Sequence, residues 1–154
     1  MGLIKIDQSR LDDAINYLKK GTKIKSDYAP LYDNLGTAYK YKKKYDEAES
    51  YYKKSINLDN NAPEAQNILG NLYSTINKNY EAIKCYKNAL KINSNFYSSH
   101  YNLGIIYKSL GMFDEAIIHL KKSIELNTFL YSAHRSLSAL VKYWLIKSFS
   151  NVIL

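Results

Sequence analysis

The sequence predicts an all-α solenoid of antiparallel helix pairs that repeat every 34 residues. Gly36, Gly70 and Gly104 are 34 residues apart, and each follows a leucine and precedes a tyrosine by three residues. An alanine comes twelve residues after each glycine: Ala48, Ala82 and Ala116. A grid of this kind is typical of a repeat array, in which each unit buries its core against its neighbours.

Each repeat predicts two helices. With the glycine at position 8, complete units cover residues 29–62, 63–96 and 97–130. In the unit 29–62, Tyr32, Leu35, Gly36 and Tyr39 follow the i, i+3, i+4, i+7 spacing of one helix face. A second such face starts at Tyr45, after a lysine-rich turn, and an Asp-Asn-Asn turn follows it. We therefore expect two helices of about 14 residues in every unit.

The unit 63–96 departs from this grid at the start of its second helix. Its aromatic residue, Tyr80, stands one place later than Tyr45 and Phe113 do in their units. We therefore expect the turn inside this unit to be re-formed.

Both ends of the chain depart from the repeat. Residues 1–28 are expected to form a partial first unit and residues 131–154 a partial or degenerate last unit, so that 1–154 is a single array. Residues 133–143 fit a further first helix, but the apolar tail 144–154 does not fit the grid. Solenoids need terminal units with a polar outer face. We infer either a fragment of a longer protein, or a tail that folds back or forms a homo-oligomer contact.

The Leu-Gly-x-x-Tyr motif, with alanine twelve residues after the glycine and a period of 34, resembles the tetratricopeptide repeat (TPR) family. The resemblance covers residues 29–130 as three full units. It implies a right-handed α-solenoid whose first helices line a concave groove. The chain is similar to the superhelical TPR arms of scaffold proteins, which also occur fused to glycosyltransferase or sulfotransferase domains.

No catalytic, metal or cofactor site is expected. His100 and His134 share position 4 of adjacent units, which favours a packing role, and His119 has no metal-ligand spacing around it. Cys85 is expected to be an inert helix residue. A single cysteine also favours a reducing compartment, and hence a cytoplasmic location. No segment is a good candidate for spanning a membrane.

The net charge of +8 raises nucleic acid as a partner. Lysines recur at positions 25 and 26 of successive second helices, for example Lys53-Lys54 and Lys121-Lys122. We interpret this ladder as a solvated outer face, which makes nucleic acid an unlikely partner; the alternative is a strip for RNA or an acidic protein.

The first helices have a stripe without a packing role, at positions 2, 5, 6, 9, 12 and 13, and in TPR proteins this stripe lines the groove. The candidate groove residues are Asn34, Thr37, Tyr41, Asn67, Asn71, Tyr101, Asn102, Lys108, Arg135 and Lys142. Asparagine both donates and accepts hydrogen bonds, which suits the backbone of an extended peptide. Asn34 and Asn102 share position 6 and resemble the asparagine ladder of superhelical TPR arms, although Ile68 interrupts it. The basic clamp of chaperone-tail TPR domains is not expected, because Ser132 and Ser136 occupy its basic places.

The leading hypothesis is therefore a non-catalytic scaffold that binds an extended peptide or a partner helix. The alternatives are the TPR arm of a larger enzyme, of glycosyltransferase or sulfotransferase type, and a basic RNA-binding array.

Overall fold

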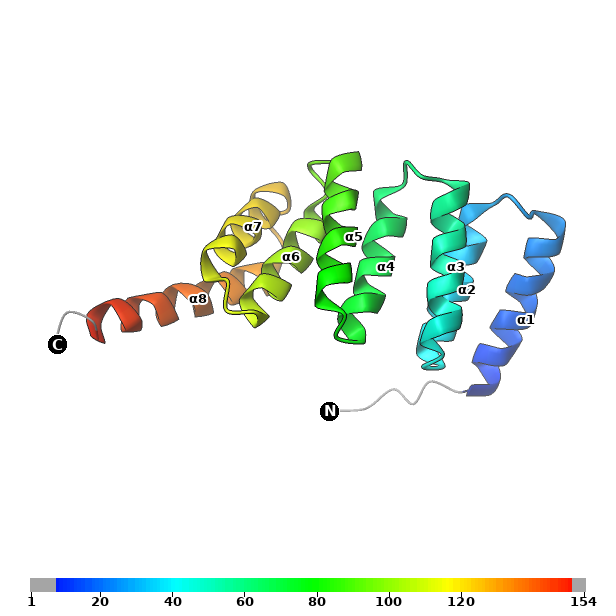
Figure 1. Cartoon of the computed structure of the whole chain (residues 1–154), viewed down its shortest axis with the longest axis horizontal. Coiled ribbons are helices and arrows are strands. Elements are labelled where there is room, and N and C mark those ends of the chain that lie inside the picture. The colour runs from blue at the N-terminus through cyan, green and yellow to red at the C-terminus, as the bar shows by residue number, and fades with distance from the viewer. Residues whose placement is uncertain (1–7, 151–154) are drawn as a thin grey trace.

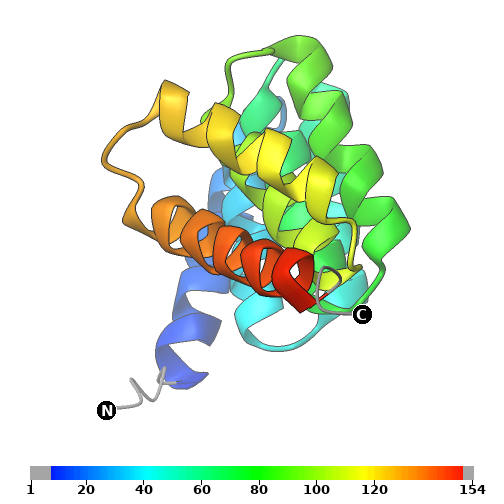
Figure 2. The same ribbon diagram turned by 90° about the vertical axis from the view of Figure 1, so that its left-hand side faces the viewer.

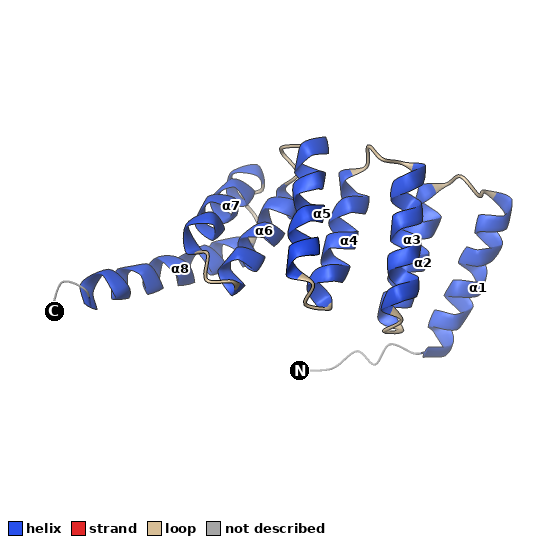
Figure 3. Cartoon of the chain, viewed as in Figure 1, coloured by secondary structure: helices blue, strands red, loops and turns tan. Residues whose placement is uncertain are grey.

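The computed structural model describes the backbone of residues 8–150 and the side chains of residues 10–143. Within this range the chain is a row of helices without a strand (Figures 1 and 3). The helices are α1 (Gln8–Ile24), α2 (Ala29–Tyr41), α3 (Tyr45–Leu58), α4 (Pro63–Thr75), α5 (Asn79–Ile92), α6 (Tyr97–Ser109), α7 (Phe113–Leu126) and α8 (Tyr131–Ser150). The helices α2, α4, α6 and α8 start 34 residues apart, which confirms the predicted all-α repeat.

The helices pack unequally on the two sides of the row. Each helix contacts the next one along the chain, and the first helices also contact each other in the order α2, α4, α6, α8. No two of the second helices α1, α3, α5 and α7 make such a contact within the described residues. The array therefore curves with the first helices on its inner side and the second helices spread apart on its outer side. Figure 2, a view from one end, shows the helices stacked one behind another.

In the first two complete units, glycine at position 8 is required by a tyrosine on the second helix of the same unit. A Cβ atom on Gly36 would lie 2.5 Å from Cε1 of Tyr52, and one on Gly70 would lie 2.6 Å from Cε1 of Tyr86. Tyr52 is fully buried and Tyr86 nearly so. The first and second helices thus approach closely through the glycine, and the aromatic ring fills the space that a side chain would take.

The turn inside each unit is the same in all three complete repeats, so the expectation for the unit 63–96 is wrong. Position 15 is left-handed each time, with φ of 58° at Lys43, 59° at Asn77 and 75° at Gly111. The helix α5 starts at Asn79, in register with α3 and α7, and Tyr80 is 78% exposed. Backbone hydrogen bonds define this turn, so it does not need an aromatic residue after it.

The loops before α2, α6 and α8 are tied by the side chain at position 4 of the unit that follows. The Tyr32 hydroxyl donates to the Ser26 carbonyl at 2.9 Å, and the His100 and His134 rings donate through Nε2 to the Ser94 and Thr128 carbonyls at 3.0 Å. The packing role expected for both histidines is wrong for His134, which is exposed, whereas His100 is partly buried. What the two share is the hydrogen bond from the ring to the preceding loop.

The last helix is longer than expected. Residues 133–143 were expected to form a first helix, but α8 continues without a turn from Tyr131 to Ser150. The tail 144–154 otherwise lies outside the residues whose side chains are described, so its proposed contacts are not tested.

Candidate functional site

The first-helix face, defined as positions 2, 5, 6, 9, 12 and 13 of α2, α4, α6 and α8, carries the candidate residues at different depths. Four are exposed: Asn34, Tyr41, Arg135 and Lys142. Five are partly buried: Thr37, Asn71, Tyr101, Asn102 and Lys108. Asn67 is only 8% exposed, so its prediction as an accessible groove residue is wrong. Its side chain is turned into the interface between α4 and α6, where it has partners.

The three asparagines of α4 and α6 form one hydrogen-bonded network. The Asn102 amide nitrogen Nδ2 donates to Oδ1 of Asn67 and to Oδ1 of Asn71, both at 2.9 Å. The Ser99 hydroxyl also donates to Asn67 Oδ1, at 3.1 Å, and the Tyr86 hydroxyl donates to Asn71 Oδ1, at 2.9 Å. The two acceptor oxygens thus each receive two hydrogen bonds, which saturates them and fixes the amide orientations.

This network leaves specific polar atoms for a ligand. No described residue hydrogen-bonds to Asn71 Nδ2 or to Asn102 Oδ1. Asn71 Nδ2 on α4 is a donor and Asn102 Oδ1 on α6 is an acceptor, so the first can bind a C=O group and the second an N–H group of a peptide backbone. Because the buried half of each amide is held by the protein, the outward half is pre-organised, which lowers the entropic cost of binding.

A related polar contact occurs one unit earlier. The hydroxyls of Thr37 and Tyr52 lie 3.1 Å apart, which corresponds to the contact between Asn71 and Tyr86. In the unit 97–130 the same two positions are Ile105 and Leu120. The polar contact below the first-helix face is therefore confined to the first two complete units.

Asp33, which shares the face but is not among the candidates, has an unusual environment. It occupies the position of Asn67, but Ala65 and Ile68 stand where Ser99 and Asn102 would provide its partners. One of its carboxylate oxygens is buried without a hydrogen-bond partner among the described residues. Burial raises the pKa of Asp33 above its ordinary value, and the negative charges of nearby acidic residues add to this shift. The buried Ser55 hydroxyl, which also has no other partner among the described residues, opposes this shift by donating toward the carboxylate.

The C-terminal part of the face is cationic. Lys108 lies on α6, and Arg135 and Lys142 lie on α8, and these two helices contain no Asp or Glu. None of the three takes part in a salt bridge within the described residues. Tyr101, also on α6, is packed against the core and partly exposed, so it offers an aromatic contact surface. This end of the face suits an anionic group.

The described part of the chain contains no group of three or more His, Cys, Asp or Glu residues that could hold a metal ion. None of its helices combines the length and the apolar character needed to cross a membrane.

Comparison with known protein families supports the repeat. Three family models match, two described as tetratricopeptide repeat, over residues 29–61 and 97–127, and one as TPR repeat, over residues 70–111. A search of curated proteins gives no match.

Solved structures resemble the chain over most of its length. A crystal structure of MamA is 26% identical, with a TM-score of 0.77, and the match covers 96% of this chain and 89% of MamA. The first TPR of Spaghetti (RPAP3), bound to the HSP90 peptide SRMEEVD, is 21% identical with a TM-score of 0.72, covering 77% of this chain and 94% of that one. YrrB, a TPR protein with an unusual peptide-binding site, is 21% identical with a TM-score of 0.67, covering 88% and 70%. At such identities the last two show the shared fold.

Proposed function

Because the chain belongs to the tetratricopeptide repeat family, we propose that it is a non-catalytic scaffold that binds an extended peptide or a partner helix on the first-helix face. The observation that carries this proposal is the pair of outward amide atoms, Asn71 Nδ2 and Asn102 Oδ1, held in place by the network below them. Amides fixed in this way recognise a peptide backbone whatever its side chains are. Two structures of the same fold are described by their peptide binding, which agrees with this assignment.

The charges on the face orient the proposed peptide. The partly exposed Asp33 on α2 places negative charge at the N-terminal part of the face, which suits an N–H or a cationic side chain. Lys108, Arg135 and Lys142, on α6 and α8, suit carboxylates. A peptide with an acidic end over α8 therefore complements the face better than a basic one.

The experiment measures the binding of labelled peptides to the full chain by fluorescence anisotropy. The probes are SRMEEVD and the same peptide with its acidic residues replaced by the corresponding amides. We expect the acidic probe to bind more tightly, and the double variant Arg135→Ala/Lys142→Ala to weaken its binding by about three- to tenfold, as two exposed charges would.

The control is Lys121→Ala, which removes an exposed lysine of α7, outside the first-helix face, and changes the net charge in the same direction. This variant should bind the probe like the unchanged chain. If Lys121→Ala weakens binding as much as the double variant does, general charge attraction explains the binding and the assignment to the first-helix face is wrong. Equal binding of the acidic and amide probes contradicts the proposed orientation.

Attachment to a glycosyltransferase or sulfotransferase domain stays a prediction. The flanking reading frame decides it, since a stop codon directly after residue 154 and no catalytic domain upstream would remove the idea.

A further inference from the structure

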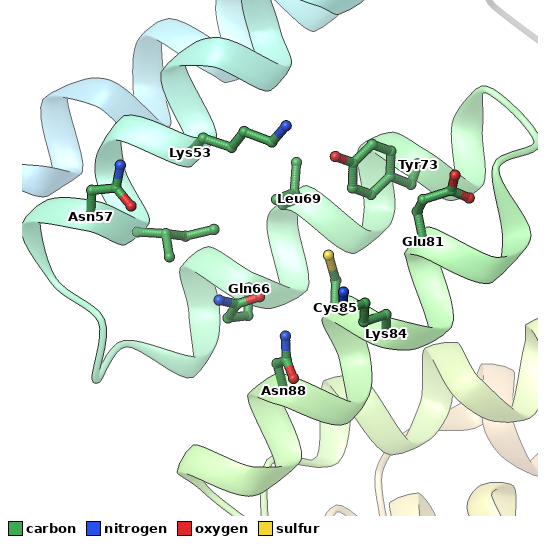
Figure 4. A pocket seen from close by; sticks show the side chains of 10 residues that line it. Lys53, Asn57, Gln66, Leu69, Tyr73, Glu81, Lys84, Cys85 and Asn88 are labelled. Carbon is green, nitrogen blue, oxygen red and sulfur yellow. The ribbon is translucent and has the colours of Figure 1, made fainter.

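The outer side of the array has a hollow between the second helices α3 and α5. These two helices do not contact each other, and the space between them, of about 430 Å³, is floored by α4. Figure 4 shows Leu69 and Tyr73 on the floor, Lys53 and Asn57 on one wall, and Cys85 on the other. Its volume falls in the range of about 300–1,000 Å³ that is typical of ligand sites.

The hollow is lined by a small residue at position 23, where the two neighbouring units carry a ring. In the preceding unit this position is Tyr51, whose ring stacks on Tyr39 with centroids 5.3 Å apart. In the following unit it is His119, whose ring stacks on Tyr107 at 5.7 Å. Both rings cover the tyrosine at position 11. In the unit 63–96 the residue is Cys85, which has no ring to stack on Tyr73, and both residues line the hollow.

The floor of the hollow is apolar and its rim is polar. Leu69, Tyr73 and Cys85 are at most 7% exposed and belong to the main core cluster. The amides of Asn57, Gln66 and Asn88 line its edge. The nearby carboxylate of Glu49 is already neutralised, since it accepts from the Tyr73 hydroxyl at 2.9 Å and pairs with Lys53 at 2.6 Å.

The outer surface of α5 carries more lysines than acidic residues. Lys84, Lys87 and Lys91 are exposed, and within the described residues none of them lies within 4.0 Å of a carboxylate oxygen. Lys84 lines the hollow together with Glu81, the single acidic residue of the helix, whereas Lys87 and Lys91 lie beside the hollow on the same helix. A second hollow, of about 250 Å³, lies along the same lysines and shares Lys84 and Asn88 with the first. The polar surface thus continues from one hollow to the other across α5.

We propose that this outer hollow binds a second protein partner, by taking one apolar side chain of an acidic segment onto its floor while carboxylates of that segment pair with the lysines of α5. The buried apolar floor favours a protein segment over nucleic acid, which has no aliphatic side chain to place there. The three exposed lysines of α5, against its one acidic residue, supply the charge complementarity that favours an acidic segment over a neutral one. The site lies on the side of the array opposite the first-helix face, so two partners can be bound at once.

The test uses the full chain and a labelled peptide of glutamates with one central leucine, compared with the same peptide carrying serine in place of leucine. Cys85→Tyr introduces the residue that fills the equivalent space in the preceding unit, and Cys85→Ala is the matched control that leaves it open. We expect the leucine peptide to bind about tenfold or more tightly than the serine peptide, as burial of one aliphatic side chain requires. Cys85→Tyr should remove this preference and Cys85→Ala should keep it.

A second variant, Lys84→Glu, changes only an exposed side chain and should weaken the leucine peptide without affecting the fold. Equal binding of the two peptides, or unchanged leucine preference in Cys85→Tyr, would overturn the proposal. Tighter binding of an oligouridylate than of either peptide would assign the lysines to nucleic acid and overturn it too. Arg135→Ala/Lys142→Ala should leave the leucine preference intact, which separates this site from the first-helix face.

Discussion

Alanine substitution of two helical glycines is expected to change stability in opposite directions. Gly36 lies against Tyr52, and an added Cβ would be 2.5 Å from Cε1 and 2.6 Å from Cδ1 of that ring. Gly21 lies in α1, where the nearest atoms to a Cβ are the flexible ends of Leu31, at 3.3 and 3.4 Å. Both positions are within helices, so alanine gains about 1 kcal/mol of helix propensity at each.

The packing cost decides the sign. The Tyr52 ring is fully buried and has no free space to move into, so displacing it by nearly an ångström costs about 1–3 kcal/mol. The movement also strains the contact of its hydroxyl with Thr37, worth about 1 kcal/mol. We expect Gly36→Ala to lower the free energy of unfolding by about 1–3 kcal/mol, after the propensity gain. Gly21→Ala should raise it by up to about 1 kcal/mol.

The assay is urea unfolding of both variants, followed by circular dichroism and by intrinsic fluorescence. Repeat arrays can unfold in parts, so coincidence of the two signals is needed before free energies are compared. A thermal melt provides a check, since about 1 kcal/mol corresponds to roughly 2–4 °C for a chain of this size. If Gly36→Ala is as stable as Gly21→Ala, the close approach of α2 and α3 does not depend on glycine and the reasoning is refuted.

Three further predictions test the side-chain environments. Asn102→Ala removes two hydrogen bonds and should lower the free energy of unfolding in urea by about 1–3 kcal/mol. The control is Asn34→Ala, at the same position of another repeat but exposed, which should lower it by less than about 0.5 kcal/mol. Equal losses would contradict the network. Asp33→Asn should stabilise the chain at pH 7, because the raised pKa of Asp33 means that folding disfavours its charged form. The gain in stability should shrink as the pH falls through that pKa. A variant that is less stable than the unchanged chain at pH 7 would contradict the raised pKa. Burial, together with the charges of the nearby His100 and Lys87, lowers the pKa of His119 from 6.5 to about 4. Between these two pH values the unfolded chain binds a proton at His119 that the folded chain does not bind, so stability should fall as the pH drops from 6.5 to 4. In melts across this range His119→Tyr should flatten the loss, and an unchanged slope would assign it to other groups.

The repeat could be predicted from the sequence because its signals are local. The spacing of Tyr32, Leu35 and Tyr39 is that of one helix face, and the glycine of each unit identifies where two helices approach. The inner turn of the unit 63–96 could not be inferred from Tyr80, because the turn depends on a left-handed residue at Asn77 and on backbone hydrogen bonds. The left-handed conformation at this position is adopted by lysine, asparagine and glycine alike, so the residue type there does not predict it.

The candidate site was predictable as a face but not residue by residue. Helical periodicity places Asn67, Asn71 and Asn102 on the same side of the first helices. Whether an amide is turned toward a ligand or toward the protein depends on partners 31 to 35 residues away, in the next repeat. The lack of hydrogen bonds from α4 to Asp33 has the same origin, because Ala65 and Ile68 of the following unit have no side-chain donor.

The sequence by itself determined the all-α architecture and the 34-residue repeat, because helix periodicity and close helix approach are written in neighbouring positions of one unit. Only the tertiary structure decided which amides remain open on the inner side and where the outer side is hollow. The amides depend on how adjacent units meet, because Ser99 and Asn102 hold Asn67 from the next unit. The hollow lies between α3 and α5 of adjacent units, where Cys85 makes no ring contact of the kind that Tyr51 and His119 make in their own units. Packing between repeats, which no single repeat contains, produces these differences between otherwise equivalent positions.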